Sequence, residues 1–152
     1  MLFRSFTDEA TGAANIYVTH NLTAGDLSKW SKPVAVEASD QEQFFPWVAA
    51  APGGRVDVVF YDRSCDSNDT LNCVTLSSSS DGGDTWSNTA LTTQGFDGDT
   101  FQACLAFVDP PDCGVFFIGD YIAVASNDAG AQVLYTANGA NAMDVFSQGV
   151  TF

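Results

Sequence analysis

Short runs of apolar residues alternate with polar ones along most of the chain, at the two-residue period of β-strands. Clusters of Gly, Asp, Asn and Ser separate these runs, as turns do. No run keeps the spacing of an amphipathic helix. The pattern therefore predicts an all-β protein with about ten short strands, near residues 2–6, 15–19, 31–36, 46–49, 56–61, 73–77, 89–93, 120–123, 132–135 and 143–150.

The most distinctive turn lies at residues 79–86, Ser-Ser-Asp-Gly-Gly-Asp-Thr-Trp. Alternating runs flank it on both sides, which is typical of a β-hairpin. Its glycines permit positive φ, and the Asp81 carboxylate can accept hydrogen bonds from turn amides. Thr85 can close the far side of the turn, and Trp86 can place an apolar ring on the sheet. The alternative is an ordinary polar hairpin.

This turn carries all the specified residues of the pattern Ser-x-Asp-x-Gly-x-Thr-Trp, at Ser79, Asp81, Gly83, Thr85 and Trp86. The chain therefore resembles the Asp-box (BNR repeat) β-propellers, the family that contains the sialidases. In that family the box is a structural turn between the third and fourth strands of a blade, away from the catalytic face. The resemblance thus implies an architecture before it implies an activity.

Two internal repeats agree with a propeller. Gly25, Asp26 and Trp30 follow a strand-like run in the order of the Asp-box, without its Ser-x-Asp start. Aligning the apolar run at 46–61 with that at 120–135 pairs Trp47 with Tyr121, and Tyr61 with Tyr135, without a gap. Such apolar runs suit inner blade strands that neighbouring blades cover on both faces. Two unrelated buried hairpins are the alternative.

The resemblance implies a β-propeller of four-stranded antiparallel blades, of which the chain holds about two and a half to three, half of a six-bladed sialidase-like ring. The blade segments are expected at about 2–38, 44–94 and 118–150, as the later three strands of one blade, a whole blade, and the first three strands of another. Residues 95–117 are expected to form a long loop. A half-propeller exposes apolar faces, so we expect the remaining blades or self-association to cover them.

The charge of the chain disfavours two classes of partner. Its net charge is −14, with five Lys and Arg residues, which disfavours nucleic acid and anionic membrane surfaces. No run reaches the 18 or more apolar residues that indicate a membrane span. We therefore expect neither a nucleic acid nor a membrane partner.

The four cysteines indicate disulfides. Three pairings are open, and pairing neighbours closes two short loops, so we expect Cys65–Cys73 and Cys104–Cys113. A four-cysteine zinc site would need a Cys-x-x-Cys spacing that the sequence lacks.

Two glycosylation sequons, at Asn21 and Asn68, agree with the cysteines in favouring a secreted, extracellular chain. Residues 1–4 lead directly into polar sequence without a visible signal peptide, so we expect a processed chain or a fragment.

The resemblance implies three arginines, a Tyr–Glu nucleophile pair and an Asp acid/base for sialidase activity, since guanidinium groups pair well with a substrate carboxylate. The arginines here are Arg4, Arg55 and Arg63, and the family's Phe/Tyr-Arg-Ile-Pro motif is absent. Arg63 is the best candidate binder, with a structural loop contact to Asp62 as the alternative, whereas Arg55 is expected to face solvent. No glutamate has a recognisable tyrosine partner, so the catalytic set is not visible.

Candidate ligand contacts lie at the starts of the two aligned apolar runs. Gln43 and Trp47 occupy one start, and Asp120 and Tyr121 the other. In a propeller these positions lie near the central channel, where aromatic rings and carboxylates can bind sugars. With Arg63 they form the candidate ligand site, and core aromatics with a capping Asp are the alternative.

We expect no metal ion or other cofactor, and a calcium ion is the alternative that the sequence offers. Asp62, Asp66 and Asp69 are oxygen donors close in sequence, but a hard cation needs six to eight oxygens, and no EF-hand loop is present. His20 is the single histidine, which excludes histidine triads and multi-histidine metal sites within this chain.

Two functions remain. The first is a secreted sialidase-like propeller segment that binds a glycan or glycoprotein through its channel face without catalysis of its own. The alternative is part of an exo-sialidase or related glycoside hydrolase whose main catalytic residues lie on blades outside this chain.

Overall fold

The computed structural model describes residues 1–10, 12–100 and 118–152, together with the backbone of 102–105 and 112–116. The described residues form strands and turns and contain no helix, which confirms the all-β prediction. The strands are β1 (Phe3–Asp8), β2 (Asn15–His20), β3 (Val34–Ala35), β4 (Gln43–Ala50), β5 (Val56–Asp62), β6 (Cys73–Ser79), β7 (Ser87–Ala90), β8 (Gln102–Leu105), β9 (Asp112–Phe116), β10 (Ala123–Asn127), β11 (Gly130–Asn138) and β12 (Met143–Thr151).

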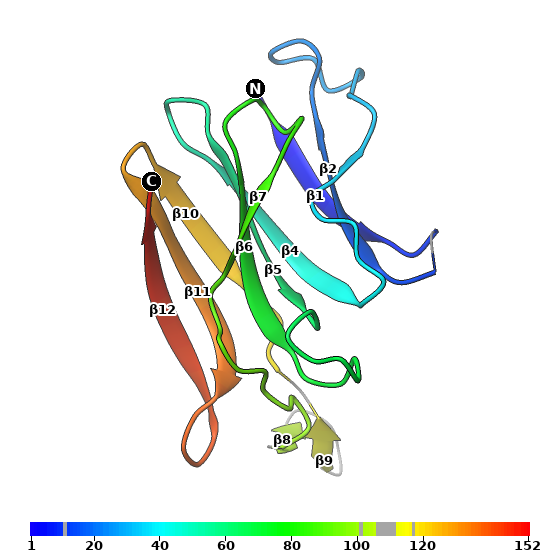
Figure 1. Cartoon of the computed structure of the whole chain (residues 1–152), viewed down its shortest axis with the longest axis vertical. Helices are drawn as coiled ribbons and strands as arrows, with labels where there is room; N and C mark the ends of the chain where they lie inside the picture. The colour runs from blue at the N-terminus through cyan, green and yellow to red at the C-terminus, as the bar shows by residue number, and fades with distance from the viewer. Residues whose placement is uncertain (11, 101, 106–111, 117) are drawn as a thin grey trace.

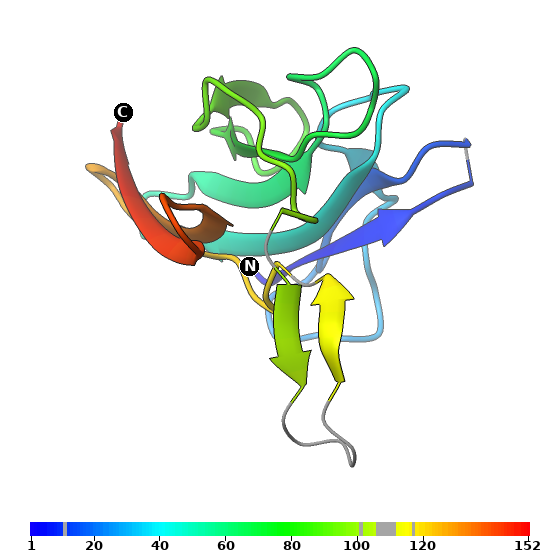
Figure 2. The ribbon, with the colours of Figure 1, turned by 90° about the horizontal axis from the view of Figure 1, so that it is seen from below.

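These strands pair antiparallel, in chain order, into the sheets β1–β3, β4–β7, β8–β9 and β10–β12. Figure 1 shows the three larger sheets side by side, with the β4–β7 sheet between the other two. Figure 2 shows the β8–β9 ribbon projecting away from them. The sheets are open, and within the described residues only the β4–β7 sheet has four strands. A propeller therefore remains a proposal.

Strand β5 is the centre of the molecule, and each of its seven residues is buried. Its branched and aromatic side chains suit a strand that is covered on both faces. Because side chains alternate along a strand, Val58 and Phe60 face the β1–β3 sheet, while Val59 and Tyr61 face the β10–β12 sheet. The buried partners are Ile16, Val18 and Val36 on the first side, and Ile122, Val124, Ala131, Val133, Tyr135 and Ala137 on the second.

Tyr61 ties the β4–β7 sheet to the β10–β12 sheet through its hydroxyl. The hydroxyl donates to the Thr136 carbonyl at 3.0 Å and accepts from the Thr136 backbone N–H at 2.9 Å. Its ring stacks on Phe44, with centroids 5.5 Å apart, and meets Phe96 edge-on. Burial raises the pKa of this phenol, so the hydroxyl remains protonated and able to donate.

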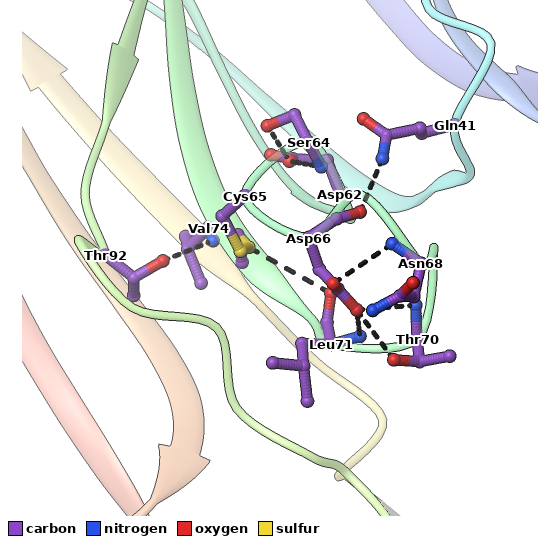
Figure 3. Close-up of a disulfide and its surroundings, with 11 residues drawn as sticks. Gln41, Asp62, Ser64, Cys65, Asp66, Asn68, Thr70, Leu71, Val74 and Thr92 are labelled. Atoms are coloured by element: carbon purple, nitrogen blue, oxygen red, sulfur yellow. Dashed lines mark hydrogen bonds between the residues drawn. A yellow bond between two sulfur atoms is a disulfide. The ribbon is translucent and has the colours of Figure 1, made fainter.

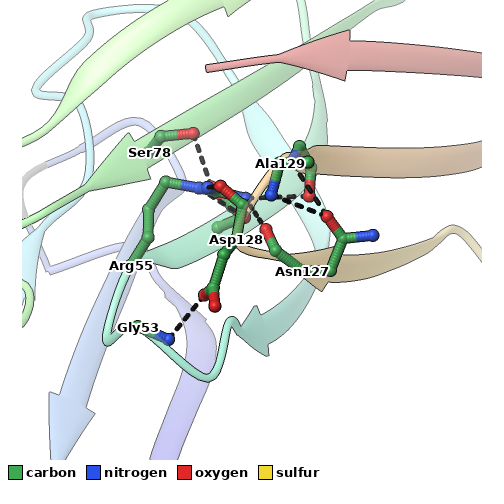
Figure 4. A network of polar contacts seen from close by, with 8 residues as sticks. Gly53, Arg55, Ser78, Asn127, Asp128 and Ala129 are labelled. Atoms are coloured by element: carbon green, nitrogen blue, oxygen red, sulfur yellow. Dashed lines mark hydrogen bonds and ion pairs between the residues drawn. The ribbon is translucent and has the colours of Figure 1, made fainter.

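Arg55 forms a second link between the same two sheets, so the expectation that it faces solvent is wrong (Figure 4). Its guanidinium pairs with Asp57 at 3.1 Å and donates to the carbonyls of Asn127 and Gly130, each at 2.8 Å. The guanidinium carbon also lies 4.1 Å from the centroid of the Phe152 ring. The turn that carries Arg55 places the side chain across the gap between the sheets.

The same network holds two further polar contacts (Figure 4). The buried Asp57 carboxylate also accepts from the Ser78 hydroxyl at 2.6 Å. Asp128 in the β10–β11 turn accepts from the Gly53 backbone N–H at 2.6 Å. The buried charge is therefore paired and hydrogen-bonded, as buried charges must be.

Strand β1 is the strand of the first sheet that has the most contacts with β4. Strand β10 contacts β4 and β5, and β4 in turn contacts β1 and β2. Strand β1 therefore takes the position in its sheet that β4 takes in the next. The expectation that the first segment holds the later three strands of a blade stays a prediction, because the open sheets do not establish blades.

The gap-free alignment of the two apolar runs fails in their first strands. The alignment matches Val59 with Val133, and Trp47 with Tyr121. Val59 pairs with Trp47 across the sheet, but Val133 pairs with Val124 and not with Tyr121. The turn between β10 and β11 is shorter than that between β4 and β5, and β4 has a register shift between Phe44 and Trp47. The alignment of Tyr61 with Tyr135 also fails, because both rings lie in the one core between the two sheets, so that Tyr61 points toward the following sheet and Tyr135 toward the preceding one.

The segment 95–117, expected to be a loop, contains the short antiparallel pair of β8 and β9. Cys104 and Cys113 fall in these strands, but their side chains, and so their predicted disulfide, lie outside the described residues. Within the part of the chain that the structure covers, we find no helix with the length and hydrophobicity to cross a membrane.

Candidate functional site

The turn at residues 79–86 is built around the Asp81 carboxylate. One oxygen accepts the backbone N–H groups of Asp84 and Thr85, both at 3.0 Å, and the other accepts the Thr85 hydroxyl at 2.5 Å. The Ser79 hydroxyl donates to the same carboxylate and accepts from the Gly83 N–H. Each specified polar side chain of the Asp-box pattern thus bonds within the turn that joins β6 to β7, as a structural role requires.

The degraded box after β2 keeps one bond of the complete box. The Trp86 indole N–H donates to the carbonyl of Gly83, three residues earlier, at 3.2 Å. The Trp30 indole N–H likewise donates to the carbonyl of Leu27 at 2.8 Å. The two turns therefore hold their tryptophans in the same local way, although the Asp26 carboxylate accepts its hydrogen bonds within the described residues from Ser28.

A third turn of this type, which the sequence analysis missed, surrounds Asp66 in the β5–β6 loop (Figure 3). Its carboxylate accepts the Thr70 hydroxyl at 2.6 Å and the backbone N–H groups of Asn68, Thr70 and Leu71. Ser64, Asp66 and Thr70 have the same spacing as Ser79, Asp81 and Thr85. That spacing was the available signal, but the aspartates of this loop suggested calcium instead.

The disulfide Cys65–Cys73 encloses this turn and confirms the predicted pairing, with Cα atoms 6.3 Å apart (Figure 3). Arg63, the candidate anion binder, donates from Nη1 to the Asp69 carbonyl at 2.8 Å. Arg63 thus makes a structural loop contact, as the alternative to ligand binding predicted. Its acceptor is the carbonyl of Asp69 and not Asp62. Arg63 therefore supports the disulfide loop.

The three calcium candidates are not assembled into one site. Asp66 is committed to its turn, and Asp69 accepts the Glu42 N–H at 3.4 Å. Asp62 is buried and accepts the backbone N–H and hydroxyl of Ser64. Among the residues whose side chains are described, no group of three His, Cys, Asp or Glu is placed to hold a metal ion.

The other candidate ligand contacts lie apart from one another. Gln43 is buried, and its side-chain oxygen accepts the Ile16 N–H at 2.9 Å, so it joins two sheets. Tyr121 is 77% exposed in the segment before β10, next to the exposed Asp120. Trp47 is 46% exposed on β4. Of this set, only Trp47 lines the cavity described next.

A cavity of about 460 Å³ lies between β1 and β4, and it is lined by Arg4, Ser5, Phe6, Pro46, Trp47 and Val48. Its lining includes the half-exposed Trp47 and the cationic Arg4. The Arg4 guanidinium carbon lies 3.9 Å from the centroid of the Trp30 ring. No hydrogen bond or ion pair engages that guanidinium within the described residues, so its donors are open to a ligand.

Sequence reasoning missed Arg4 because it placed the residue in a terminal segment. The available signal was the alternation in β1. Phe3 packs against the core, so side chains of opposite parity, such as those of Arg4 and Phe6, belong to the other face of the strand. Two segments that are distant in sequence, 4–6 and 46–48, then meet at the cavity.

Comparison of the chain with family models, curated proteins and solved structures found no match. The resemblance to Asp-box propellers therefore depends on the motif and on the turn geometry described above.

Acid should destabilise the fold through Asp66 and Asp81. Hydrogen bonds from the threonine hydroxyls, and then from turn N–H groups, hold the pKa of both carboxyls well below the usual aspartate range. The two carboxylates therefore stabilise the fold fully above about pH 4, which is the aspartate pKa in the unfolded chain. This stabilisation is lost as the pH falls toward their lower pKa in the folded chain. Denaturant unfolding of the wild type between about pH 7 and pH 2 should show this loss.

Two variants test this assignment. Asp81→Asn should reduce the slope of stability against pH below about pH 4, whereas Asp40→Asn, at an exposed position, should leave it unchanged. Equal slopes in the wild type and Asp81→Asn would show that the turn does not depend on the charge.

Proposed function

We propose that the chain is a segment of a secreted, sialidase-like Asp-box propeller that binds a glycan or glycoprotein without hydrolysing it. The observation that carries this proposal is the cavity between β1 and β4, with Trp47 and Arg4 in its lining. The Asp-box turn at residues 79–86 agrees with a protein of this kind, and the Cys65–Cys73 disulfide agrees with an extracellular location.

The lining suits an acidic sugar. The flat Trp47 ring offers an apolar surface to the C–H face of a sugar ring, and Phe6 and Pro46 extend that apolar wall. The open donors of Arg4 suit a carboxylate, which a guanidinium binds through paired hydrogen bonds. The volume lies in the range of small-ligand sites. Since the chain carries a net charge of −14, a local cation is needed to hold an anionic group.

The positions of the arginines favour binding over catalysis. Arg55 is committed to Asp57 and two carbonyls, and Arg63 donates to the Asp69 carbonyl. Arg4 is the arginine that lines the cavity. Sialidase activity would require three guanidinium groups that converge on one substrate carboxylate, and the three arginines of this chain do not converge.

Binding of a sialylated oligosaccharide to the purified chain tests the proposal. Arg4→Ala and Trp47→Ala should each weaken binding about tenfold or more in calorimetric titration, since each loses at least about 1.4 kcal/mol of contact. Trp47→Phe should retain part of the affinity. Lys32→Ala removes one positive charge outside the cavity and should have little effect.

A second assay separates binding from hydrolysis. The wild type should release no fluorophore from a fluorogenic sialoside. Release that Arg4→Ala abolishes would contradict the non-catalytic part of the proposal. Equal binding by wild type, Arg4→Ala and Trp47→Ala would instead show that the cavity is not the ligand site.

A further inference from the structure

The structure separates the two glycosylation sequons. Asn21 is only 1% exposed. Its Nδ2, the atom that would carry a glycan, donates to the Thr23 carbonyl at 2.5 Å, and its Oδ1 accepts the Leu2 N–H at 2.6 Å. A glycan on this nitrogen would have to displace the bond to Thr23 and enter a buried space. The folded chain is therefore incompatible with a glycan at Asn21.

Asn68 has the opposite surroundings. It is exposed on the turn around Asp66, and its backbone N–H donates to the Asp66 carboxylate at 3.1 Å (Figure 3). Its side-chain amide makes no hydrogen bond within the described residues. The backbone is thus fixed while the reactive nitrogen remains free.

The remaining sequon residues agree with this placement. Thr70, the hydroxyl residue of the sequon, is exposed and donates to Asp66. The Cys65–Cys73 disulfide closes the loop on which the sequon lies. A glycan at this position would extend into solvent without displacing a core contact.

We propose that Asn68 is the N-glycan acceptor of the folded protein and that Asn21 remains unmodified. The inference rests on the secretion included in the proposed function. The donor would be a lipid-linked oligosaccharyl pyrophosphate. Nδ2 of Asn68 bonds to the anomeric carbon, the bond from that carbon to the pyrophosphate oxygen breaks, and one amide proton leaves to a base of the transferase. The pyrophosphate lipid is the leaving group, and nothing is oxidised or reduced.

The test is secretion of the chain from a eukaryotic host behind a cleavable leader. Intact mass is measured before and after treatment with an amidase that removes N-glycans and converts the acceptor Asn to Asp. One amidase-sensitive glycan is expected on the wild type, and peptide mapping should place the converted residue at position 68.

Three variants assign the site. Asn68→Gln should lose the glycan. Thr70→Ser should retain it, because the sequon and the hydroxyl are both preserved. Thr23→Ala destroys the first sequon but leaves the backbone carbonyl that Asn21 uses, so this variant should retain the glycan too.

Secreted protein with the Cys65–Cys73 disulfide and no amidase-sensitive mass would overturn the assignment. A glycan lost in Thr23→Ala, or mapped to position 21, would overturn it equally. These outcomes are distinct from failure of the proposed function, because sialoside binding can be measured on the same preparation after amidase treatment.

Discussion

Replacing Arg55 with methionine should lower the free energy of unfolding by about 3–5 kcal/mol, the usual cost of leaving a buried charge without its partner. Arg55 is the cation that pairs with Asp57, whose side chain is fully buried. The substitution also removes the donors to the Asn127 and Gly130 carbonyls. Denaturant unfolding followed by tryptophan fluorescence measures the effect.

A double variant identifies the buried charge as the cause. Arg55→Met with Asp57→Asn should be less destabilised than Arg55→Met alone, because the uncompensated carboxylate is gone. Arg63→Met is the matched control, since Arg63 is a half-buried arginine for which we find one carbonyl bond. A loss below about 1 kcal/mol in Arg55→Met would place the pair among weak surface contacts.

Replacing Tyr61 with alanine should cost about 3–5 kcal/mol, the range for truncating a buried aromatic ring. Tyr61 is 1% exposed and packs between the two sheets against Phe44 and Phe96. Tyr61→Phe keeps the ring but leaves the N–H and carbonyl of Thr136 without their partner. This variant should lose about 1–3 kcal/mol, again measured by denaturant unfolding.

The difference between the two Tyr61 variants divides the effect between ring and hydroxyl. Tyr17→Phe is the control, because Tyr17 stacks on Phe6 on the other side of the molecule and is half-buried. It should change the stability by less than about 0.5 kcal/mol. If Tyr61→Phe were as stable as the wild type, the hydroxyl would not be a link between the sheets.

The positions of most strands could be predicted because their information is local. Alternation of apolar residues placed β2, β5, β6 and β12 close to their observed bounds. The turn at residues 79–86 followed from side chains that bond to their own neighbours. The disulfide Cys65–Cys73 also closes a short loop, so its spacing carried the signal.

Contacts between sheets could not be predicted in the same way. Arg55 bonds to carbonyls 72 and 75 residues further along the chain, and nothing beside it in sequence indicates those acceptors. The cavity likewise joins Arg4 to Trp47 through the packing of β1 on β4. The role of Asp66 was open for a local reason, because an oxygen-rich turn and a cation site share the same residue types.

The burial of β5 on both faces determines how the molecule can come apart. Detaching either flanking sheet would uncover one side of a strand in which every residue is buried. The three sheets are therefore poorly suited to act as independent modules. Shortening the chain from either end would remove one of the two sheets that cover β5. The other sheet would then pack on a strand that is exposed on one face.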